Sequence, residues 1–388
     1  MQQHSTYYKQ CSQCILDTND DPEIFFDEKG ICNHCHIYND FLKNRIFLGE
    51  VGDDKLIALI KDIKESGRGK EYDCVLGISG GTDSTYVAWV AKQLGLRPLV
   101  VHLDNGWNSE LSVKNIENVL NKLGFDLYTH VIDWEEFRDL QLSFLKASVV
   151  DIEMLTDHAI AAIIYKIAAK YNLKYILSGE NISTEGLLPA SWVHNKNDLM
   201  NIKSIHNKFG KKKLKTFPQL GFAKLFWYEK IKHIKYIPIL NFIDYNKVNA
   251  KQFLTESLSW RDYGGKHYES IWTRFYQSYI LPRKFHIDKR KSHYSTLICS
   301  GQMTKEQALE EMKRPIIDEQ LLKTDKEFVI KKFGLTDIEF ENIMKLPVKK
   351  HTDYESIMNV YKQVRPLYRV LKPLFSRAKP KTQDNITS

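Results

Sequence analysis

Long apolar runs are missing from this chain of 388 residues. No stretch approaches the ~20 consecutive apolar residues that a membrane-spanning helix needs. The first ten residues also lack the apolar run of roughly 7–15 residues that marks a secretory signal peptide. We therefore expect a cytoplasmic protein with no transmembrane segment. Internal repeats are missing too, and with 43% apolar residues the chain can bury a core divided into two or three units.

An excess of acidic residues is also absent, since 56 Lys and Arg residues face 48 Asp and Glu residues and give a net charge of +8. A basic protein suits a phosphorylated substrate, a nucleic acid or an anionic membrane surface, and charge alone does not choose among them. Much of the excess lies in residues 211–213 and 349–381, where a solvated surface is the more common explanation.

Cysteine is scarce, but four of the six cysteines form two CxxC pairs, Cys11 with Cys14 and Cys32 with Cys35, separated by residues 15–31. This is the spacing of a zinc ribbon with two knuckles. Four thiolates complete a closed tetrahedral shell, which makes the expected Zn²⁺ structural, because no position remains for water. Disulfides are the weaker alternative in a reducing compartment.

The chain divides into four predicted parts. Residues 1–50 form the zinc ribbon, and residues 51–70 form a linker with a helix near 53–65. Residues 71–300 form a nucleotide-binding domain with substrate-binding insertions, and residues 301–388 form a helical C-terminal region with segments at 305–313, 337–344 and 354–370. In the second half of the chain, beyond residue 189, the periodicity is hard to read.

Short apolar runs alternate with helical periodicity from residue 72 onward. Strands alternating with helices predict an α/β fold with a mainly parallel, doubly wound sheet. The predicted strands are residues 74–78, 98–103, 127–132 and 175–177, and the predicted helices are residues 84–94, 111–123, 137–146 and 155–171.

The lysine of a Walker phosphate loop is missing from the most informative segment, which reads as strand, glycine turn and helix start. Adjacent glycines let the backbone approach a ligand, and the N–H groups of the following helix favour an anion. An acid stands where a Walker loop has lysine, so we expect Mg²⁺ to bridge this carboxylate, Asp83, and the phosphates. The segment is Ser79-Gly80-Gly81-Thr82-Asp83-Ser84-Thr85.

This loop resembles the SGGxDS signature of the PP-loop ATP-pyrophosphatases, the superfamily of GMP synthetase and asparagine synthetase. The resemblance implies that the whole loop binds ATP. It also implies two further ATP contacts: Asp104, in Asp104-Asn105-Gly106, facing the adenosine, and Gly179 with Glu180, in Ser178-Gly179-Glu180-Asn181, closing the pocket. Taken alone, both segments read equally well as turns.

Over residues from about 5 to 315, the chain resembles more closely the N-acetyl sugar amidotransferases of bacterial surface-polysaccharide and lipopolysaccharide O-antigen pathways. The cysteine ribbon, the loop and residues 260–302 carry this resemblance. It implies conversion of a sugar acetamido group to an acetamidino group with ATP and ammonia, through an adenylated imidate. Because such a step needs positive charge at the phosphates, we expect catalytic roles for Lys284, Arg290 and Lys291, with Lys266 as a further candidate.

A glutaminase nucleophile is not visible, because residue 2 is Gln2 and four cysteines are assigned to the metal. The resemblance likewise implies that ammonia comes from a partner similar to the glutaminase and cyclase subunits of histidine biosynthesis. The expected substrate is a sugar, with a nucleotide as one candidate carrier, and we expect no nucleic acid. Two alternatives stay open: a tRNA-modifying PP-loop enzyme of the lysidine or thiolation type, and a non-catalytic binding module built on the zinc ribbon.

Overall fold

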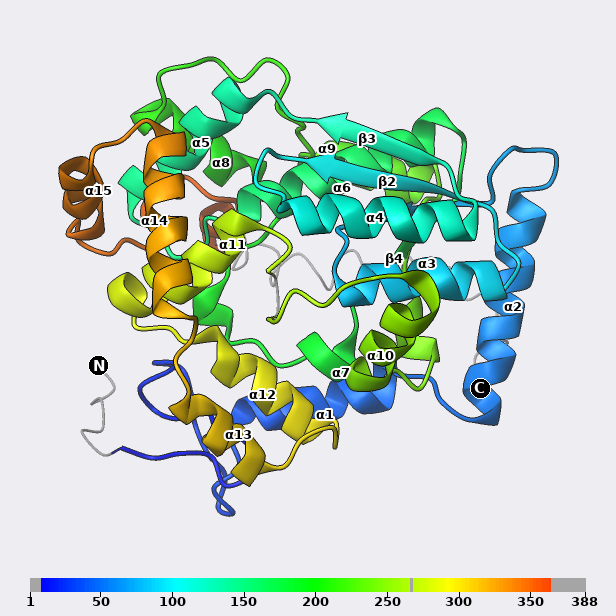
Figure 1. The fold of residues 1–388 in the computed structure, drawn as a ribbon, viewed down its shortest axis with the longest axis horizontal. Helices are drawn as coiled ribbons and strands as arrows, with labels where there is room; N and C mark the ends of the chain where they lie inside the picture. The colour runs from blue at the N-terminus through cyan, green and yellow to red at the C-terminus, as the bar shows by residue number, and fades with distance from the viewer. Residues whose placement is uncertain (1–7, 266–267, 364–388) are drawn as a thin grey trace.

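The computed structural model describes residues 8–265 and 268–363, and its centre is a sheet of five parallel strands (Figure 1). The strand order is β3-β2-β1-β4-β5, and each neighbouring pair is parallel. Four strands confirm the prediction, and β5 was not predicted. The strands are β1 (Cys74–Gly77), β2 (Pro98–Asp104), β3 (Leu127–Val131), β4 (Tyr175–Ser178) and β5 (Lys235–Pro238).

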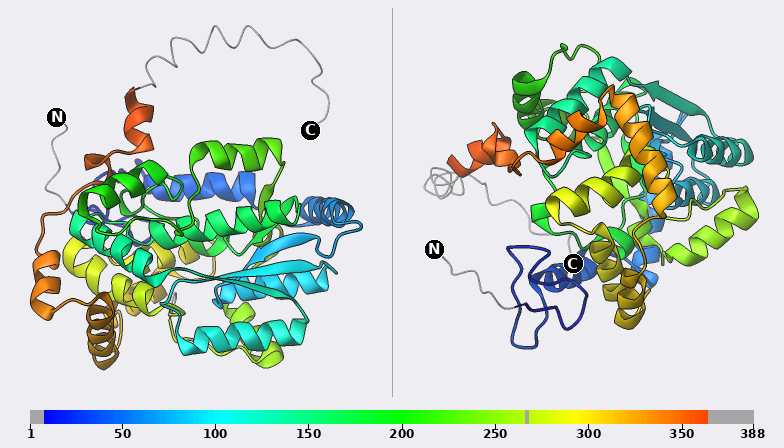
Figure 2. Two further views of the ribbon diagram at one scale, coloured as in Figure 1. Left: turned by 90° about the horizontal axis from the view of Figure 1, so that it is seen from above. Right: turned by 60° about the vertical axis from the view of Figure 1, so that its left-hand side comes forward.

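Helices cover both faces of this sheet (Figure 2), so the predicted doubly wound architecture is confirmed. Along the strands, alternate side chains enter two separate cores, as the pleat requires. Leu76 and Val100 pack in one core with α3 (Thr82–Gln93), α4 (Glu110–Leu123) and α10 (Lys247–Leu258). Val75 and Val101 pack in the other core, with α5 (Trp134–Ala147) and α6 (Met154–Lys170).

The strand order reverses between β1 and β4, which creates a topological switch point at the carboxyl edge of the sheet. The two crossovers from β1 to β3 use α3 and α4, and the return from β3 to β4 uses α5 and α6 on the opposite face. The loops that follow β1 and β4 lie at this point, which is where open α/β sheets bind ligands.

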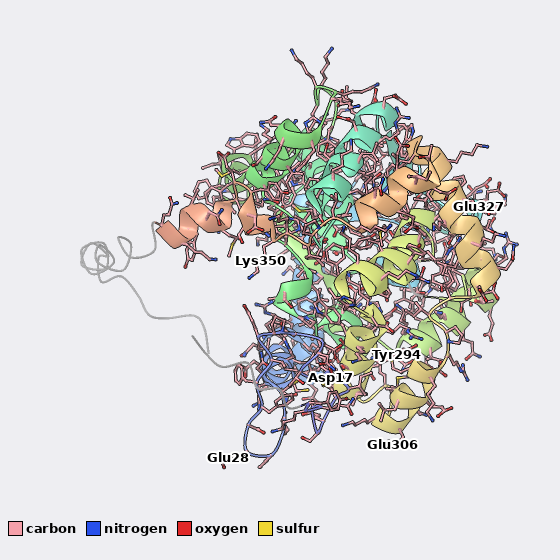
Figure 3. All side chains as sticks on the ribbon, turned by 90° about the vertical axis from the view of Figure 1, so that its left-hand side faces the viewer. Asp17, Glu28, Tyr294, Glu306, Glu327 and Lys350 are labelled. Atoms are coloured by element: carbon pink, nitrogen blue, oxygen red, sulfur yellow. The ribbon has the colours of Figure 1, made fainter. Side chains whose placement is uncertain are left out.

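The cysteine-bearing segment lies against the C-terminal part of the chain (Figures 1 and 2). It leads into α1 (Asn33–Arg45) and α2 (Glu50–Ser66), the second of which contains the helix predicted near residues 53–65. The backbone N–H of Ile15 donates to Ser295 Oγ of α12 (Lys289–Cys299) at 3.3 Å. Figure 3 shows Asp17 beside the helix that carries Tyr294, with Glu28 at the outer tip of this segment.

The region after β4 is mostly helical, as predicted for the C-terminal part. The helices predicted at 305–313 and 337–344 are confirmed as α13 and α15. The predicted segment 354–370 extends past the described residues, and α14 was not predicted. The remaining elements are α7 (Ile182–Glu185), η1 (Ala190–Trp192), α8 (Leu199–Phe209), α9 (Phe222–Phe226), η2 (Trp227–Ile231), η3 (Ile239–Phe242), α11 (Ile271–Phe275), η4 (Tyr276–Phe285), α13 (Lys305–Lys313), α14 (Glu319–Phe333), α15 (Asp337–Met344) and η5 (His351–Asp353).

Within residues 8–265 and 268–363, every helix is too short or too polar to cross a bilayer. One of the two cores contains residues of the cysteine segment, the sheet and the C-terminal helices together. The predicted domain boundaries at residues 50, 70 and 300 stay predictions.

Candidate active site

The glycine loop between β1 and α3 is held from outside by two aromatic side chains. Gly80 has a φ of +84°, a left-handed conformation that glycine adopts without strain. Its carbonyl accepts hydrogen bonds from Trp260 Nε1 and from Tyr263 Oη, both at 2.8 Å. A Cβ at this position would lie 3.0 Å from the Ser112 carbonyl oxygen and from Tyr263 Oη. The loop is thus fixed by contacts that leave no space for a side chain.

Inside the loop, serine hydroxyl groups accept hydrogen bonds from the backbone N–H groups. The N–H of Ser79 donates to Ser84 Oγ at 3.2 Å, and the N–H of Gly81 donates to Ser79 Oγ at 3.3 Å. Helix α3 begins directly after Gly81 and has no side-chain cap. Its first-turn N–H groups and the positive end of its dipole therefore face the loop as an anion site.

The end of β4 closes against this helix start. Gly179 has so little space that a Cβ would lie 2.8 Å from the backbone nitrogen of Ser84 and 3.0 Å from the carbonyl carbon of Asp83. The carboxylate of the next residue, Glu180, accepts a hydrogen bond from Tyr236 Oη at 3.0 Å. Burial raises the pKa of Glu180, with the charges of Glu185 and Asp157 adding to the effect. The glycine loop, residues 79–85, and the segment 178–181, both expected at the nucleotide, therefore meet at the switch point.

Asp83 points from the first turn of α3 to two residues that the sequence analysis did not find. Tyr245 Oη donates to Asp83 Oδ1, and Lys247 Nζ lies 3.3 Å from Asp83 Oδ2. Both side chains of the Asp83–Lys247 pair are mostly buried. Burial opposes the charged form of Lys247, but the negative charges of Asp83 and Glu185 outweigh it, so the pKa of Lys247 is raised.

Lys247 is a basic residue at the loop that the sequence analysis did not assign. Lys247 is the first residue of α10, and Asn246 caps this helix. The N–H groups of Val248 and Asn249 both donate to Asn246 Oδ1 at 3.0 Å. This asparagine cap was the one local signal that a helix starts here. The preceding strand β5 gave no signal, because Lys235 and Tyr236 are exposed and no apolar run marks the strand.

Asp104 ends the neighbouring strand β2 at the same edge of the sheet. Its Oδ1 accepts from the Gly106 N–H at 2.9 Å and from Asn108 Nδ2 at 3.3 Å. Asn108 Nδ2 also lies 3.0 Å from His102 Nε2, and His102 Nδ1 lies 2.9 Å from the Ile78 carbonyl oxygen. Since that carbonyl only accepts, His102 holds its proton on Nδ1, and burial lowers its pKa. These hydrogen bonds fix the segment at one side of the site.

Two family models match the chain. Residues 55–187 match the model described as NAD synthase, which covers the sheet from β1 to β4 and the glycine loop. Residues 269–367 match the model described as LPS biosynthesis protein WbpG-like, C-terminal domain. The chain carries a PP-loop domain and a WbpG-like C-terminal domain. Together the two matches are consistent with the expected PP-loop family member in lipopolysaccharide biosynthesis.

The similar solved structures have low sequence identity to this chain and low TM-scores. An NH3-dependent NAD synthetase from Campylobacter jejuni is 15% identical, with 54% of this chain and 85% of that chain covered and a TM-score of 0.28. An NMN synthetase from Francisella tularensis is 18% identical (53% and 86% covered, TM-score 0.28). A predicted subunit of a tRNA methyltransferase from Methanocaldococcus jannaschii is 18% identical (47% and 73% covered, TM-score 0.27). Among curated proteins, no match was found.

The WbpG-like domain begins beside the glycine loop. The Ser109 N–H donates to the Glu269 carbonyl oxygen at 2.9 Å, and the Ile271 N–H donates to the Trp107 carbonyl oxygen at 2.9 Å. The carboxylate of Glu269 lies so close that a Cβ on Gly81 would be 3.2 Å from Glu269 Oε1. Glu269 is thus a further acid at the loop that the sequence analysis did not assign.

The three basic residues expected at the phosphates lie in the WbpG-like domain with other partners. Lys284 Nζ donates to the carbonyl oxygens of Ile343, Met344 and Leu346, and burial lowers its pKa to about 8. Arg290 pairs with Asp288 at 2.7 Å, and Lys291 pairs with Asp17 at 2.7 Å and with Asp20 at 2.9 Å. Among the described residues, none of the three contacts the loop in this structure, so their catalytic role stays a prediction. Lys266 lies outside the described residues.

The four predicted metal ligands form one buried cluster. The sulfur atoms of Cys11, Cys14, Cys32 and Cys35 all lie within 4.8 Å of one another, and all four side chains are buried. The N–H groups of Cys14 and Cys32 point at Cys11 Sγ, at 3.4 and 3.2 Å. Four convergent thiols with N–H···S contacts can hold a metal ion. A fifth cysteine, Cys299 of α12, has its sulfur 3.7 Å from Cys35 Sγ, which the sequence did not indicate.

Gly179→Ala should weaken both the fold and nucleotide binding. The added methyl group meets backbone atoms of Asp83 and Ser84, which cannot move without shifting the loop, so we expect a loss of about 1–3 kcal/mol in unfolding free energy. Gly221→Ala is the matched control, because its Cβ would meet only the flexible side chain of Leu199, at 3.3 Å. Urea unfolding and nucleotide titration measure the two effects. Equal behaviour of the two variants would show that the contact does not position the loop.

Proposed function

We propose that this chain is an ATP-dependent amidotransferase, a carbon–nitrogen ligase that forms AMP and pyrophosphate. It converts the acetamido group of a bacterial sugar to an acetamidino group in the synthesis of lipopolysaccharide O-antigen or another surface polysaccharide. One observation carries the proposal: a PP-loop site and a WbpG-like domain share one chain, and the first residue of the matched domain, Glu269, lies against Gly81 of the loop.

The proposed reaction needs activation because an amide carbonyl is a poor electrophile. The carbonyl oxygen attacks the α-phosphorus of ATP, the bond from this phosphorus to the oxygen that bridges the α- and β-phosphates breaks, and pyrophosphate leaves with that oxygen. Ammonia then adds to the carbon of the resulting O-adenylyl imidate, and AMP leaves with the former carbonyl oxygen. No protein nucleophile is required, so the protein contributes positioning and stabilisation of charge.

The loop and its surroundings fit this task. The uncapped N–H groups of α3 and the positive charge of Lys247 are suited to the phosphates. Asp83 offers a carboxylate oxygen beside them, with the acids Glu185 and Glu269 close enough to Lys247 to act on its pKa. This donor set fits Mg²⁺, which binds one or two carboxylates together with phosphate oxygens and, when bound, neutralises their charge. Lys247 would then exchange its ion pair with Asp83 for the phosphates.

Asp83→Asn should lower ATP turnover about a hundredfold or more, because losing a metal-binding carboxylate removes several kcal/mol of charge stabilisation. The fold should remain, since the amide oxygen still accepts the hydrogen bond from Tyr245 Oη. Asp62→Asn, the same change on the exposed side of α2, is the control. Pyrophosphate release at saturating Mg-ATP is the measurement, and near-normal release by Asp83→Asn would refute the assignment.

We propose Zn²⁺ as the ion of the cysteine cluster, with a structural role, because all four thiols are buried and converge on one another. The purified chain should contain one zinc per molecule, and Cys32→Ser should lose it and unfold at lower temperature. Cys299→Ser should keep the zinc, because this neighbouring thiol is not one of the four. Elemental analysis of fresh protein decides, and protein without zinc would contradict the proposal.

We also propose that ammonia comes from a partner glutaminase, similar to the glutaminase and cyclase subunits of histidine biosynthesis. The six cysteines leave no candidate nucleophile: four cluster, Cys299 lies beside them, and Cys74 is fully buried in β1, where burial raises its pKa.

The isolated chain should therefore form acetamidino product with high ammonium and not with glutamine. Adding the partner should restore use of glutamine. Product formed from glutamine by the chain alone would sink this part of the proposal.

A tRNA-modifying enzyme is the main rival. The thiolation type needs a reactive cysteine near the loop, and the one cysteine in the strand before the loop, Cys74, is fully buried with a raised pKa. The lysidine type needs none. Pyrophosphate release measured with an N-acetyl sugar, free or nucleotide-linked, with tRNA, or with neither separates the two. Release stimulated by tRNA alone would replace the proposed function.

A further inference from the structure

The helix formed by α9 and η2 presents four large apolar side chains to solvent. The exposed fractions are 67% for Phe222, 50% for Phe226, 41% for Trp227 and 60% for Ile231. Single exposed apolar residues are ordinary on protein surfaces, but an apolar patch on one element marks a site of interaction. These residues are the apolar part of what we call the basic aromatic face.

A change of helical register keeps this face continuous. Residues 222 and 226 are four apart in the α-helical part, and residues 226 and 231 are five apart where the helix is π-helical. The π register is visible in the hydrogen bond from the Lys232 N–H to the Trp227 carbonyl oxygen, at 2.9 Å. In an α-helix a spacing of five would turn Ile231 away, whereas a π turn returns it to the same side. Such single π turns occur frequently at functional sites.

The opposite side of the same helix is anchored. Tyr228 is buried and stacks on Tyr165 of α6, with 5.6 Å between ring centroids. Glu229, the one acid in residues 222–235, accepts a hydrogen bond from Tyr165 Oη at 3.0 Å. The exposed side therefore does not result from a loosely packed helix, and its single acid is engaged with α6.

Four lysines lie on this helix or directly after it. They are Lys224, Lys230 and Lys232 on the helix and Lys235 at the start of β5. The ammonium of Lys232 lies 5.0 Å from the centroid of the exposed Trp227 ring, whereas Lys224 lies 6.0 Å from the Tyr228 ring and Lys235 lies 5.4 Å from the Tyr175 ring. Across residues 8–265 and 268–363, no carboxylate forms an ion pair with any of these four ammonium groups. A face with aromatic and aliphatic side chains and uncompensated positive charge matches the anionic, amphipathic surface of a bilayer.

We propose that the basic aromatic face binds the surface of a membrane that contains anionic lipids. The apolar side chains would enter the boundary between headgroups and acyl chains, where tryptophan and phenylalanine are favoured, and the lysines would contact the headgroup phosphates. This association is peripheral, and it does not depend on the reaction proposed above.

Charge and position argue against other occupants of this face. The sequence beyond residue 363 is itself basic, with Arg365, Arg369 and Lys372, so it would be repelled. An RNA would stack on the rings but would gain nothing from Ile231. The C-terminal end of the helix also lies at the amino edge of the sheet, because Lys174 Nζ, next to the start of β4, donates to the Lys232 carbonyl oxygen at 2.7 Å. The glycine loop lies at the opposite edge of the sheet, so membrane binding leaves the loop accessible.

Co-sedimentation of the full chain with large unilamellar vesicles tests the proposal. The chain should sediment with vesicles of phosphatidylglycerol and phosphatidylcholine, and far less with phosphatidylcholine alone. Salt should weaken the binding, because it screens the lysines. Phe222→Ser combined with Phe226→Ser should weaken it roughly tenfold or more, and Lys230→Gln and Lys232→Gln should each weaken it roughly fivefold.

Ile338→Ser on α15 is the matched control, because this side chain is 74% exposed and lies outside the face. It should bind vesicles as the unaltered chain does. The proposal is overturned if the chain does not bind anionic vesicles, or if the control loses as much binding as the face variants. It is also overturned if the face variants change only self-association or RNA binding.

Discussion

The contact between Asp83 and Lys247 organises the rest of the site. It places an acid and a base, both mostly buried, in front of the uncapped start of α3. A carboxylate beside an anion site is unfavourable without a cation, and in this structure the ammonium of Lys247 supplies that charge. The pair also joins two parts of the chain, since Asp83 follows the first strand of the sheet and Lys247 begins the helix that follows the last strand.

The segments outside the sheet act on the same loop. Trp260 and Tyr263 hold the carbonyl of Gly80, and Glu269 of the WbpG-like domain lies against Gly81. The cysteine ribbon lies further from the loop and contacts α12. Cys299 Sγ of α12 lies 3.7 Å from Cys35 Sγ, and Thr296 of the same helix accepts a hydrogen bond from the N–H of Leu187, which follows α7. These contacts join the cysteine cluster to the helix that carries Glu185.

Much of this arrangement could be predicted from the sequence, because strong local signals marked it. The strands β1 to β4 are apolar runs, the glycine loop has a characteristic composition, and the CxxC pairs have zinc spacing. The edge strand β5 could not be recognised, since its exposed Lys235 and Tyr236 interrupt the apolar pattern. Lys247 was missed for the same reason, because its position at the site depends on that strand.

The basic residues of α12 show a second limit of prediction from the sequence. A lysine or arginine in a family-like segment suggests a phosphate contact, but its partner is set by folding. Lys291 pairs with Asp17 and Asp20, which lie far away in the sequence and reach it only because the ribbon packs on α12. Cys299 meets Cys35 for the same reason. Neither contact leaves a local pattern that could have been read beforehand.

The central claim is that the acetamido oxygen of a sugar attacks the α-phosphorus of ATP at this loop. An N-acetyl sugar labelled with ¹⁸O in its acetamido carbonyl tests this most directly, in a reaction with Mg-ATP and ammonium followed by mass spectrometry of the products. The account predicts one ¹⁸O atom in AMP and none in pyrophosphate. Label in inorganic phosphate, with ADP as the other product, or label retained in the sugar while ATP is consumed, would contradict it.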